Sequence, residues 1–474
     1  MKPATDFEIV HLYNRLAFGI TPAEMQAAQG KSCSQIINEI YSAADKFADI
    51  DEVDTAQLST MDVLSMNKEE RKALFEKGLL FTKKLNLTLL DKFINDKAQA
   101  RLKMTLFWSG HFACRSLNAA FQQKLFNTIQ ENSLGNFKTL LLEVSKSSAM
   151  LQFLNNQQNR KRHPNENFAR EVMELFTLGR GHYTEQDIKE SARAFTGWGF
   201  NAHGEYEFRA LTHDNGIKIF LGEQGNFSGE DIINIILQQP QCSIFITRKF
   251  YKYFVNEENI DEQFVSDAAD VFRKSNYEIA ALAAYIFTHP HFYEQKNIGT
   301  RIKPPVELIT SLLRNVKVEF DNKALLINAQ KILGQILFLP PSVAGWAGGR
   351  NWIDSSSLLY RMSLPRLFFK NEVPMLQAKQ EADDQLMDKN ETDLKRHPSA
   401  KEMMQTYADT ESFVQHFEKI DDKNLVSFLK NMYLGMAQNT LPSNTFNEFE
   451  NLERKEKIKK TSLYIFSMPQ FQLG

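Results

Sequence analysis

The stretch NENFAREVMELFTLG (residues 165–179) places its apolar side chains at the spacing of an amphipathic helix. They recur at i, i+4, i+7 and i+8, at Phe168, Val172, Leu175 and Phe176. The following stretch, RGHYTEQDIKESARAFTGW (180–198), predicts a second helix that starts near Glu185 behind a capping box of Thr184 and Asp187. Only a short segment with Gly179 and Gly181 separates the two, so we expect them to pack as an antiparallel or crossed helical hairpin.

A second line of side chains runs along the first of these helices, at Asn167, Glu171, Glu174 and Leu178. At ~100° per residue these four positions share one azimuth. A leucine on this line indicates that protein covers it, which would leave both carboxylates at the margin of a pocket, in need of a cation or a metal as partner. The alternative is simple salt bridging along the helix, in which Arg170 reaches Glu166 and Glu174.

The bulk composition indicates a folded, water-soluble protein. Of 474 residues, 43% are hydrophobic and 24% are charged, and the 37 phenylalanines predict a phenylalanine-rich core. The formal net charge of −2 provides no basic field for nucleic acid, so we expect no nucleic-acid partner. The 3 cysteines are widely spaced and odd in number, which excludes a disulfide scaffold and a CxxC metal site.

Helical periodicity or helix caps cover most of the chain, which predicts a mainly α fold. The expected helices span 8–17, 22–28, 33–48, 68–95, 98–109, 119–131, 136–147, 166–178, 185–195, 230–238, 242–255, 260–274, 277–288, 304–315, 322–335 and 355–369. One segment differs, YEFRALTHDNGIKIFLG (206–222). Apolar and polar residues alternate on either side of Asp214-Asn215-Gly216, which predicts a small β-hairpin insertion with a tight turn. The last seventy residues resume helical patterning.

We expect three parts: a large multi-helix domain over 1–370, a polar linker or mobile excursion over 371–404, and a helical C-terminal appendage over 405–474. Residues 376–402 have too little apolar surface to offset the cost of ordering, so limited proteolysis should cut there first. The amino terminus shows no signal peptide, which predicts a cytoplasmic location unless a leader has been removed, and then a periplasmic one. No apolar run is long enough for a transmembrane segment.

Histidines are the first candidate partners for the two carboxylates. His111 ends an apolar helix in LFWSGHFACR, and His213 with Asp214 stands at the expected hairpin turn. An acid/base or metal centre would combine Glu171, Glu174, His111, His213 and Asp214, with Glu171 or Glu174 as base or ligand. The metal, if one is bound, is unknown, and a divalent ion is the option we consider. The alternative is that each histidine is a structural hydrogen-bonding residue.

Other side chains are candidates for substrate binding: Asn167, Arg170, Arg193, Lys249, Trp346 and Trp352. Arg193 or Lys249 would hold an anionic group. Lys249, in FITRKFYKYFV, alternates with aromatic residues and could instead extend from a core helix to solvent. Trp346 and Trp352, in a glycine-rich loop, either stack on sugar rings or fasten that loop to the body.

Several segments together resemble a known bacterial family. In chain order they are FWSGHF, NENFAREVMELFTLGRGHYTEQDIKESARAFTGW, THDNGIKIFLG, FITRKFYKYFV, KPPVELI and PPSVAGWAGGRNWIDSSSLLYR. Over residues 8–370 they are similar to the family catalogued as domain of unknown function 1800, although Ser-Gly precedes His111 where the family usually has a polar pair. The resemblance implies a neighbouring sulfatase- or alkaline-phosphatase-like partner, and a function linked to the cell envelope or to polysaccharides. It implies no catalytic residue.

Two function classes stay open. The first is a hydrolase-like enzyme with a carboxylate/His centre, with or without a metal, that acts on an anionic or saccharide-linked substrate. The second is a non-enzymatic binding or assembly partner of an envelope or polysaccharide-processing protein, in which the polar line is a buried structural network.

Overall fold

The computed structural model describes residues 2–54, 67–116, 118–370, 372 and 405–474. Within these ranges the predicted mainly α fold is confirmed. Its principal helices are α1 (Asp6–Leu16), α2 (Pro22–Ala28), α3 (Cys33–Ala44), α4 (Lys68–Asn95), α5 (Gln99–His111), α6 (Ala119–Asn132), α7 (Phe137–Lys146), α8 (Ser148–Phe153), α9 (Asn167–Glu171), η2 (Val172–Thr177), α10 (Glu185–Ala194), α11 (Gly229–Gln238), α12 (Pro240–Phe254), α13 (Glu262–Lys274), α14 (Ile279–Thr288), α15 (Pro305–Asn315), α16 (Ala324–Ile332), α17 (Ser355–Lys370), α19 (Thr410–Gln415), α20 (Leu425–Leu434), α21 (Asn447–Glu450) and α22 (Arg454–Phe466).

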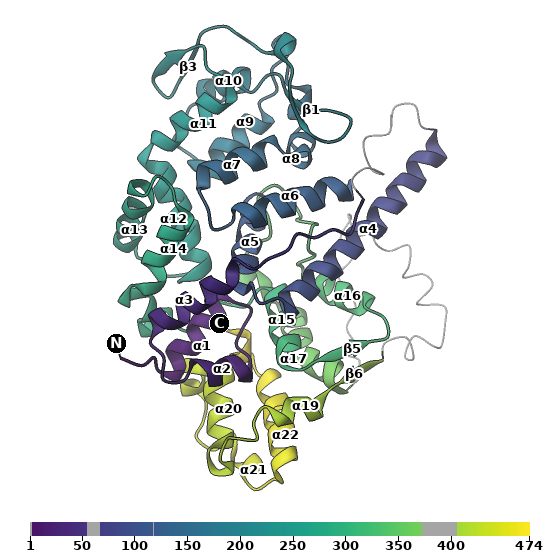
Figure 1. Ribbon diagram of the computed structural model, residues 1–474, viewed down its shortest axis with the longest axis vertical. Helices are drawn as coiled ribbons and strands as arrows, with labels where there is room; N and C mark the ends of the chain where they lie inside the picture. The colour runs from purple at the N-terminus through teal and green to yellow at the C-terminus, as the bar shows by residue number, and fades with distance from the viewer. Residues whose placement is uncertain (1, 55–66, 117, 371, 373–404) are drawn as a thin grey trace.

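The helices form an elongated body (Figure 1). One end contains α7–α11, the middle contains α5, α6 and α12–α14, and α19–α22 form the other end. Capping explains where many of these helices begin, because the side chain of an N-cap residue binds backbone amides that have no partner inside the helix. Reciprocal capping boxes start α1, α2, α3, α10 and α11, and the box predicted from Thr184 and Asp187 is confirmed.

Aromatic side chains fill the middle of the body, as the 37 phenylalanines predicted. Trp108 on α5 is fully buried, and its ring centroid lies 5.5 Å from that of Phe137 and 5.9 Å from that of Phe112. Phe112 in turn lies 5.2 Å from Phe176 on η2. Helix α5 is therefore surrounded by protein, and this packing fixes the position of His111 at its C-terminal end.

The predicted hairpin over 206–222 is wrong. Two separate hairpins flank its centre: β1 (Trp198–Phe200) pairs with β2 (Tyr206–Phe208), and β3 (Lys218–Phe220) pairs with β4 (Glu223–Gly225). The Asp214-Asn215-Gly216 segment that indicated a turn is held elsewhere, because the Asp214 carboxylate binds Arg193 on α10. The tight turn instead lies at Leu221 and Gly222, both with positive φ, as a two-residue hairpin loop requires.

The C-terminal segment contacts the rest of the described chain at several places. Strand β6 (Thr406–Ala408) pairs with β5 (Val318–Phe320), and α20 packs against α1. The last residue, Gly474, exchanges backbone hydrogen bonds with Arg301. The predicted mobile stretch 376–402 lies outside the described residues, and the division into three parts stays a prediction.

In the described part of the chain, none of the helices combines the length and the apolar character that crossing a bilayer would need.

Candidate functional site

The helix that contains the polar line changes its hydrogen-bonding pattern halfway along. Residues 167–171 are α-helical, whereas η2 is a π-helix, with bonds from residue i+5 to residue i. The amide of Leu178, for example, donates to the carbonyl of Met173 at 2.8 Å. Because a π turn holds an extra residue, side chains beyond it rotate away from the α-helical azimuth. Leu178 is fully buried, as its place on the predicted line indicated, and Glu171 and Glu174 are half-buried.

The last turn of η2 leaves two backbone carbonyls free to accept other donors. In a continued α-helix, the carbonyl of Leu175 would accept from the amide of Gly179, but that amide binds Met173 instead. The ammonium of Lys249 on α12 donates to the carbonyl of Leu175 at 2.8 Å, and Nε2 of His111 lies 3.1 Å from the carbonyl of Phe176. Helices α5 and α12 are thus joined to the end of η2.

Both ring nitrogens of His111 are engaged. Nε2 carries the hydrogen that is donated to Phe176, so Nδ1 accepts from the Lys249 ammonium at 3.2 Å. Burial, with the adjacent charge of Lys249, holds the pKa of His111 well below its usual range, which keeps the ring neutral. Burial and the nearby Lys252 lower the pKa of Lys249 to about 8.

Beside this junction lies a cavity of about 220 Å³ between α5, α12 and the glycine-rich loop. We call it the α5–α12 cavity. Its walls include His111, Lys249, Lys252, Tyr253, Glu257, Arg301, Gln335, Trp346 and Trp352. Among the described residues that line it, three are cationic and one is a carboxylate. The structure therefore brings together four side chains proposed from the sequence, at positions 111, 249, 346 and 352.

Glu257 follows α12 and faces the glycine-rich loop. A Cβ atom at Gly348 or Gly349 would collide with its carboxylate, so these glycines allow the backbone to approach Glu257 closely. Within the described residues this carboxylate has no hydrogen-bond or ion-pair partner. Burial raises the pKa of Glu257, although the charges of Arg301 and Arg15 oppose that shift. Glu257 is thus a carboxyl group whose neutral form is favoured more than in water.

A buried ionic network lies behind the cavity wall. Arg301 forms a bidentate pair with Glu307 on α15, with N–O distances of 2.8 and 2.9 Å. The same carboxylate accepts from Lys103 on α5 at 2.6 Å and from the hydroxyl of Tyr253 at 2.8 Å. Burial alone would raise the pKa of Glu307, but Arg301 and Lys103 lower it to about 2. The network therefore holds Arg301 and Tyr253 in fixed positions on the cavity wall.

The two carboxylates of the polar line do not line this cavity. Glu174 binds Arg180 and accepts from the hydroxyl of Tyr183 at 3.1 Å. Among the residues that the structure describes, Glu171 has no such partner, and burial together with the charge of Glu174 raises its pKa. Arg170 does not bind Glu174; it binds Glu185 at 2.9 Å and Glu166 at 3.3 Å. Asn167 is exposed at the start of α9.

The other proposed residues lie near the strands β1–β4. Nδ1 of His213 lies 2.8 Å from the carbonyl of Thr196, and the His213 side chain is buried. The carboxylate of Asp214 binds Arg193 at 2.8 and 3.2 Å, and Arg193 also binds Glu190. Arg193 with Asp214 thus fastens the 213–217 segment to α10. His213 and Asp214 do not meet His111 in this arrangement, because neither lines the α5–α12 cavity.

The family described as "Protein of unknown function (DUF1800)" matches residues 11–473. This range contains every residue of the α5–α12 cavity and extends the resemblance seen over 8–370 to the C-terminal segment. The chain belongs to the DUF1800 family. No curated protein and no solved structure matches it.

In this DUF1800 member, no three His, Cys, Asp or Glu side chains of the described ranges gather as metal ligands do. Three cavity residues were missed from the sequence: Tyr253, Glu257 and Arg301. Tyr253 occurs in FITRKFYKYFV, where alternation with aromatic residues favoured a core helix. A signal for Glu257 was its place just beyond the end of that helix, in FVNEEN, and Arg301 lies two residues before KPPVELI.

Proposed function

We propose that this DUF1800 protein is a hydrolase-type enzyme that binds an anionic, saccharide-linked substrate in the α5–α12 cavity. One observation carries the proposal: Glu257, which has a raised pKa and no partner in the described ranges, shares a cavity with Lys249, Lys252 and Arg301. A perturbed titratable group in a cleft, next to an excess of opposite charge, is a general mark of functional sites.

The cations would hold the anionic group of the substrate. Lys249 uses two of its N–H groups on His111 and Leu175, which leaves the third for a ligand. Lys252 is exposed at the cavity and adds a second ammonium. Arg301 binds Glu307 with two of its nitrogens, so it contributes mainly through its electric field.

The two tryptophans support a sugar-containing ligand. Trp352 is buried and Trp346 is half-buried in the wall of the same cavity. Aromatic rings provide flat apolar surfaces for the C–H faces of sugars, and the surrounding charged groups provide orientation. This arrangement favours a sugar with an attached carboxylate, sulfate or phosphate over a purely apolar ligand.

Glu257 would act as the general acid. In its protonated form it donates a proton to the leaving oxygen while the bond to that oxygen breaks. A water molecule then adds to the other fragment, and the Glu257 carboxylate takes the proton that the water releases, which restores the acid. His111 is not used as the base, because both of its nitrogens are engaged.

A second candidate function is a non-enzymatic binding protein. This binding function is favoured because the described lining of the cavity has a single carboxylate, whereas most enzymes that hydrolyse glycosidic bonds use two carboxylic acid side chains. Its partner would be the sulfatase- or alkaline-phosphatase-like protein that the family resemblance implies. The anionic esters on which such enzymes act match the charge of the cavity.

The experiment combines turnover and binding. The protein is incubated with 4-nitrophenyl sulfate, phosphate and glucuronide, and binding of the same compounds is measured by calorimetry. We expect Glu257→Gln to retain binding and lose release of nitrophenol, with Glu258→Gln as the matched control, because Glu258 is exposed and paired with Arg350. Binding without turnover in wild type would favour the second candidate, and neither binding nor turnover would reject both.

A further inference from the structure

A turn of four basic residues lies after α8. Arg160, Lys161, Arg162 and His163 are all exposed, and the amide of His163 donates to the carbonyl of Arg160 at 2.8 Å, which closes the turn. None of the four forms an ion pair with any residue that the structure describes. The positive charge of Arg160, Lys161 and Arg162 contrasts with the net charge of −2 of the whole chain.

Large apolar side chains are exposed directly beside this turn. The amide of Lys161 donates to the carbonyl of Thr212 at 2.9 Å, so the turn lies against the segment that carries Leu211. Leu211 is 89% exposed and Phe208, on β2, is 47% exposed. We call the basic turn with Leu211 and Phe208 the basic–apolar end.

The backbone beneath the basic–apolar end is firmly held. The amide of Arg209 donates to the carbonyl of Gly197 at 2.8 Å, and its guanidinium donates to the carbonyl of Phe200 at 2.8 Å. The side chain of Asn159 donates to the carbonyl of Ala192 at 2.8 Å. The apolar side chains are therefore presented by a folded support and do not reflect a frayed loop.

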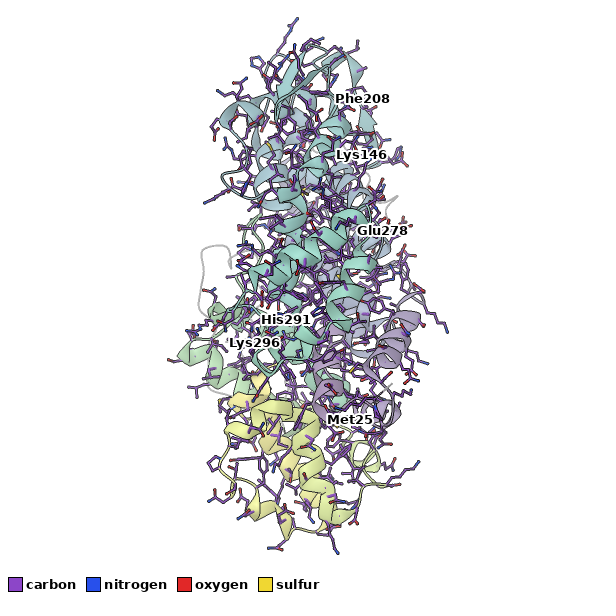
Figure 2. All side chains as sticks on the ribbon, turned by 90° about the vertical axis from the view of Figure 1, so that its left-hand side faces the viewer. Met25, Lys146, Phe208, Glu278, His291 and Lys296 are labelled. Atoms are coloured by element: carbon purple, nitrogen blue, oxygen red, sulfur yellow. The ribbon has the colours of Figure 1, made fainter. Side chains whose placement is uncertain are left out.

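This surface occupies one end of the long axis. Figure 2 shows Phe208 at the upper end of the molecule, and Figure 1 shows β1 and β3 at the same end, far from α20–α22. An end of an elongated body can approach a flat surface without collision with the rest of the protein. Because the remainder of the chain carries net negative charge, an anionic plane would attract this end and repel the other parts.

We propose that the basic–apolar end docks on an anionic lipid surface. Leu211 and Phe208 would enter the boundary between headgroups and acyl chains, while the basic turn binds phosphate groups of the lipids. The acidic neighbour Glu207 is neutralised by Arg209 at 2.9 Å, and Glu205 is the remaining exposed carboxylate of this hairpin. The proposal does not depend on the function of the α5–α12 cavity, since none of these residues lines it.

Co-sedimentation of the full chain with vesicles tests the proposal. We expect binding to phosphatidylcholine vesicles that contain about a third phosphatidylglycerol, little binding to pure phosphatidylcholine, and release at about 1 M NaCl. Removal of one cation in Arg162→Ala should lower the partition coefficient roughly fivefold, and Leu211→Asp should lower it further. Both residues are exposed, so melting curves of the variants should match wild type.

Leu80→Asp is the matched control, because Leu80 on α4 is also exposed, at 67%, and lies outside the basic–apolar end. It should bind vesicles like wild type. The proposal is overturned if wild type does not sediment with anionic vesicles, or if Leu211→Asp and Arg162→Ala bind as tightly as Leu80→Asp. Retention on a heparin column without vesicle binding would also overturn it, and would assign the basic turn to a soluble polyanion.

Discussion

The ammonium of Lys249 donates a hydrogen bond to Nδ1 of His111 across 3.2 Å. The two residues are 138 positions apart, and each also binds a backbone carbonyl at the end of η2. π turns inside helices frequently occur at functional sites. Here the turn places a partly desolvated lysine at the wall of the α5–α12 cavity.

The first prediction concerns the pH dependence of stability. The pKa of Lys249 falls from 10.5 in the unfolded chain to about 8 in the folded one. Between these values the unfolded state binds more protons, so the free energy of unfolding should rise with pH, by ~3 kcal/mol at most. The free energy of unfolding of Lys249→Met should rise by correspondingly less over this range, as denaturant titrations between pH 7 and 11 would show. A wild-type curve parallel to that of the variant would contradict the lowered pKa.

The second prediction concerns the ionic network behind the cavity. Glu307→Gln leaves Arg301 and Lys103 buried without their carboxylate, so unfolding by denaturant should show a loss of about 3–5 kcal/mol. Wild type should keep this stability above pH 4.5 and lose it as the pH falls toward 2, where the Glu307 carboxylate is protonated.

Glu319→Gln on the exposed face of β5 is the control for the network and should change stability little. If Glu307→Gln were as mild as that control, the network would not hold the cavity wall as described.

The third prediction concerns the polar line. Burial and Glu174 raise the pKa of Glu171, so its carboxylate is disfavoured in the folded protein. Glu171→Gln should therefore leave the melting temperature at neutral pH unchanged or raise it, and the difference should vanish below pH 4.5. Glu174→Gln loses the Arg180 pair and the Tyr183 hydrogen bond, and should melt slightly lower. A clear loss of melting temperature in Glu171→Gln would assign Glu171 to a structural network.

Much of the helical fold could be predicted from the sequence, because apolar periodicity and capping residues act locally. Each range expected to be helical coincides with an observed helix to within about one turn. The hairpin around Asp214 failed for a tertiary reason: the pairing of Asp214 with Arg193 outweighs the local turn preference of Asn-Gly. The π turn was not predicted either, because apolar periodicity and caps do not distinguish it from an α-helical turn.

The cavity could be predicted only in part. His111, Lys249, Trp346 and Trp352 each stood out by residue type, and folding places all four around one cavity. Glu257 was missed because a glutamate directly beyond a helix end is ordinary in sequence, and its burial arises from a loop about 90 residues later. Glu171 and Glu174 were proposed as site residues from their spacing along one helix. Spacing does not reveal which surface of that helix faces a cavity.

Calorimetric titration of wild type and Lys249→Met with glucuronate, and with glucose as the neutral counterpart, tests the assignment of the α5–α12 cavity most directly. Arg248→Met is the matched control, because Arg248 is the neighbouring cation but pairs with Glu262 outside the cavity. We predict that glucuronate binds wild type and Arg248→Met alike and binds Lys249→Met at least tenfold more weakly, since a hydrogen bond to a charged group contributes about 1.5–3 kcal/mol. Equal affinity of glucuronate for wild type and Lys249→Met, or equal affinity of wild type for glucose and glucuronate, would contradict an anion-binding role for this cavity.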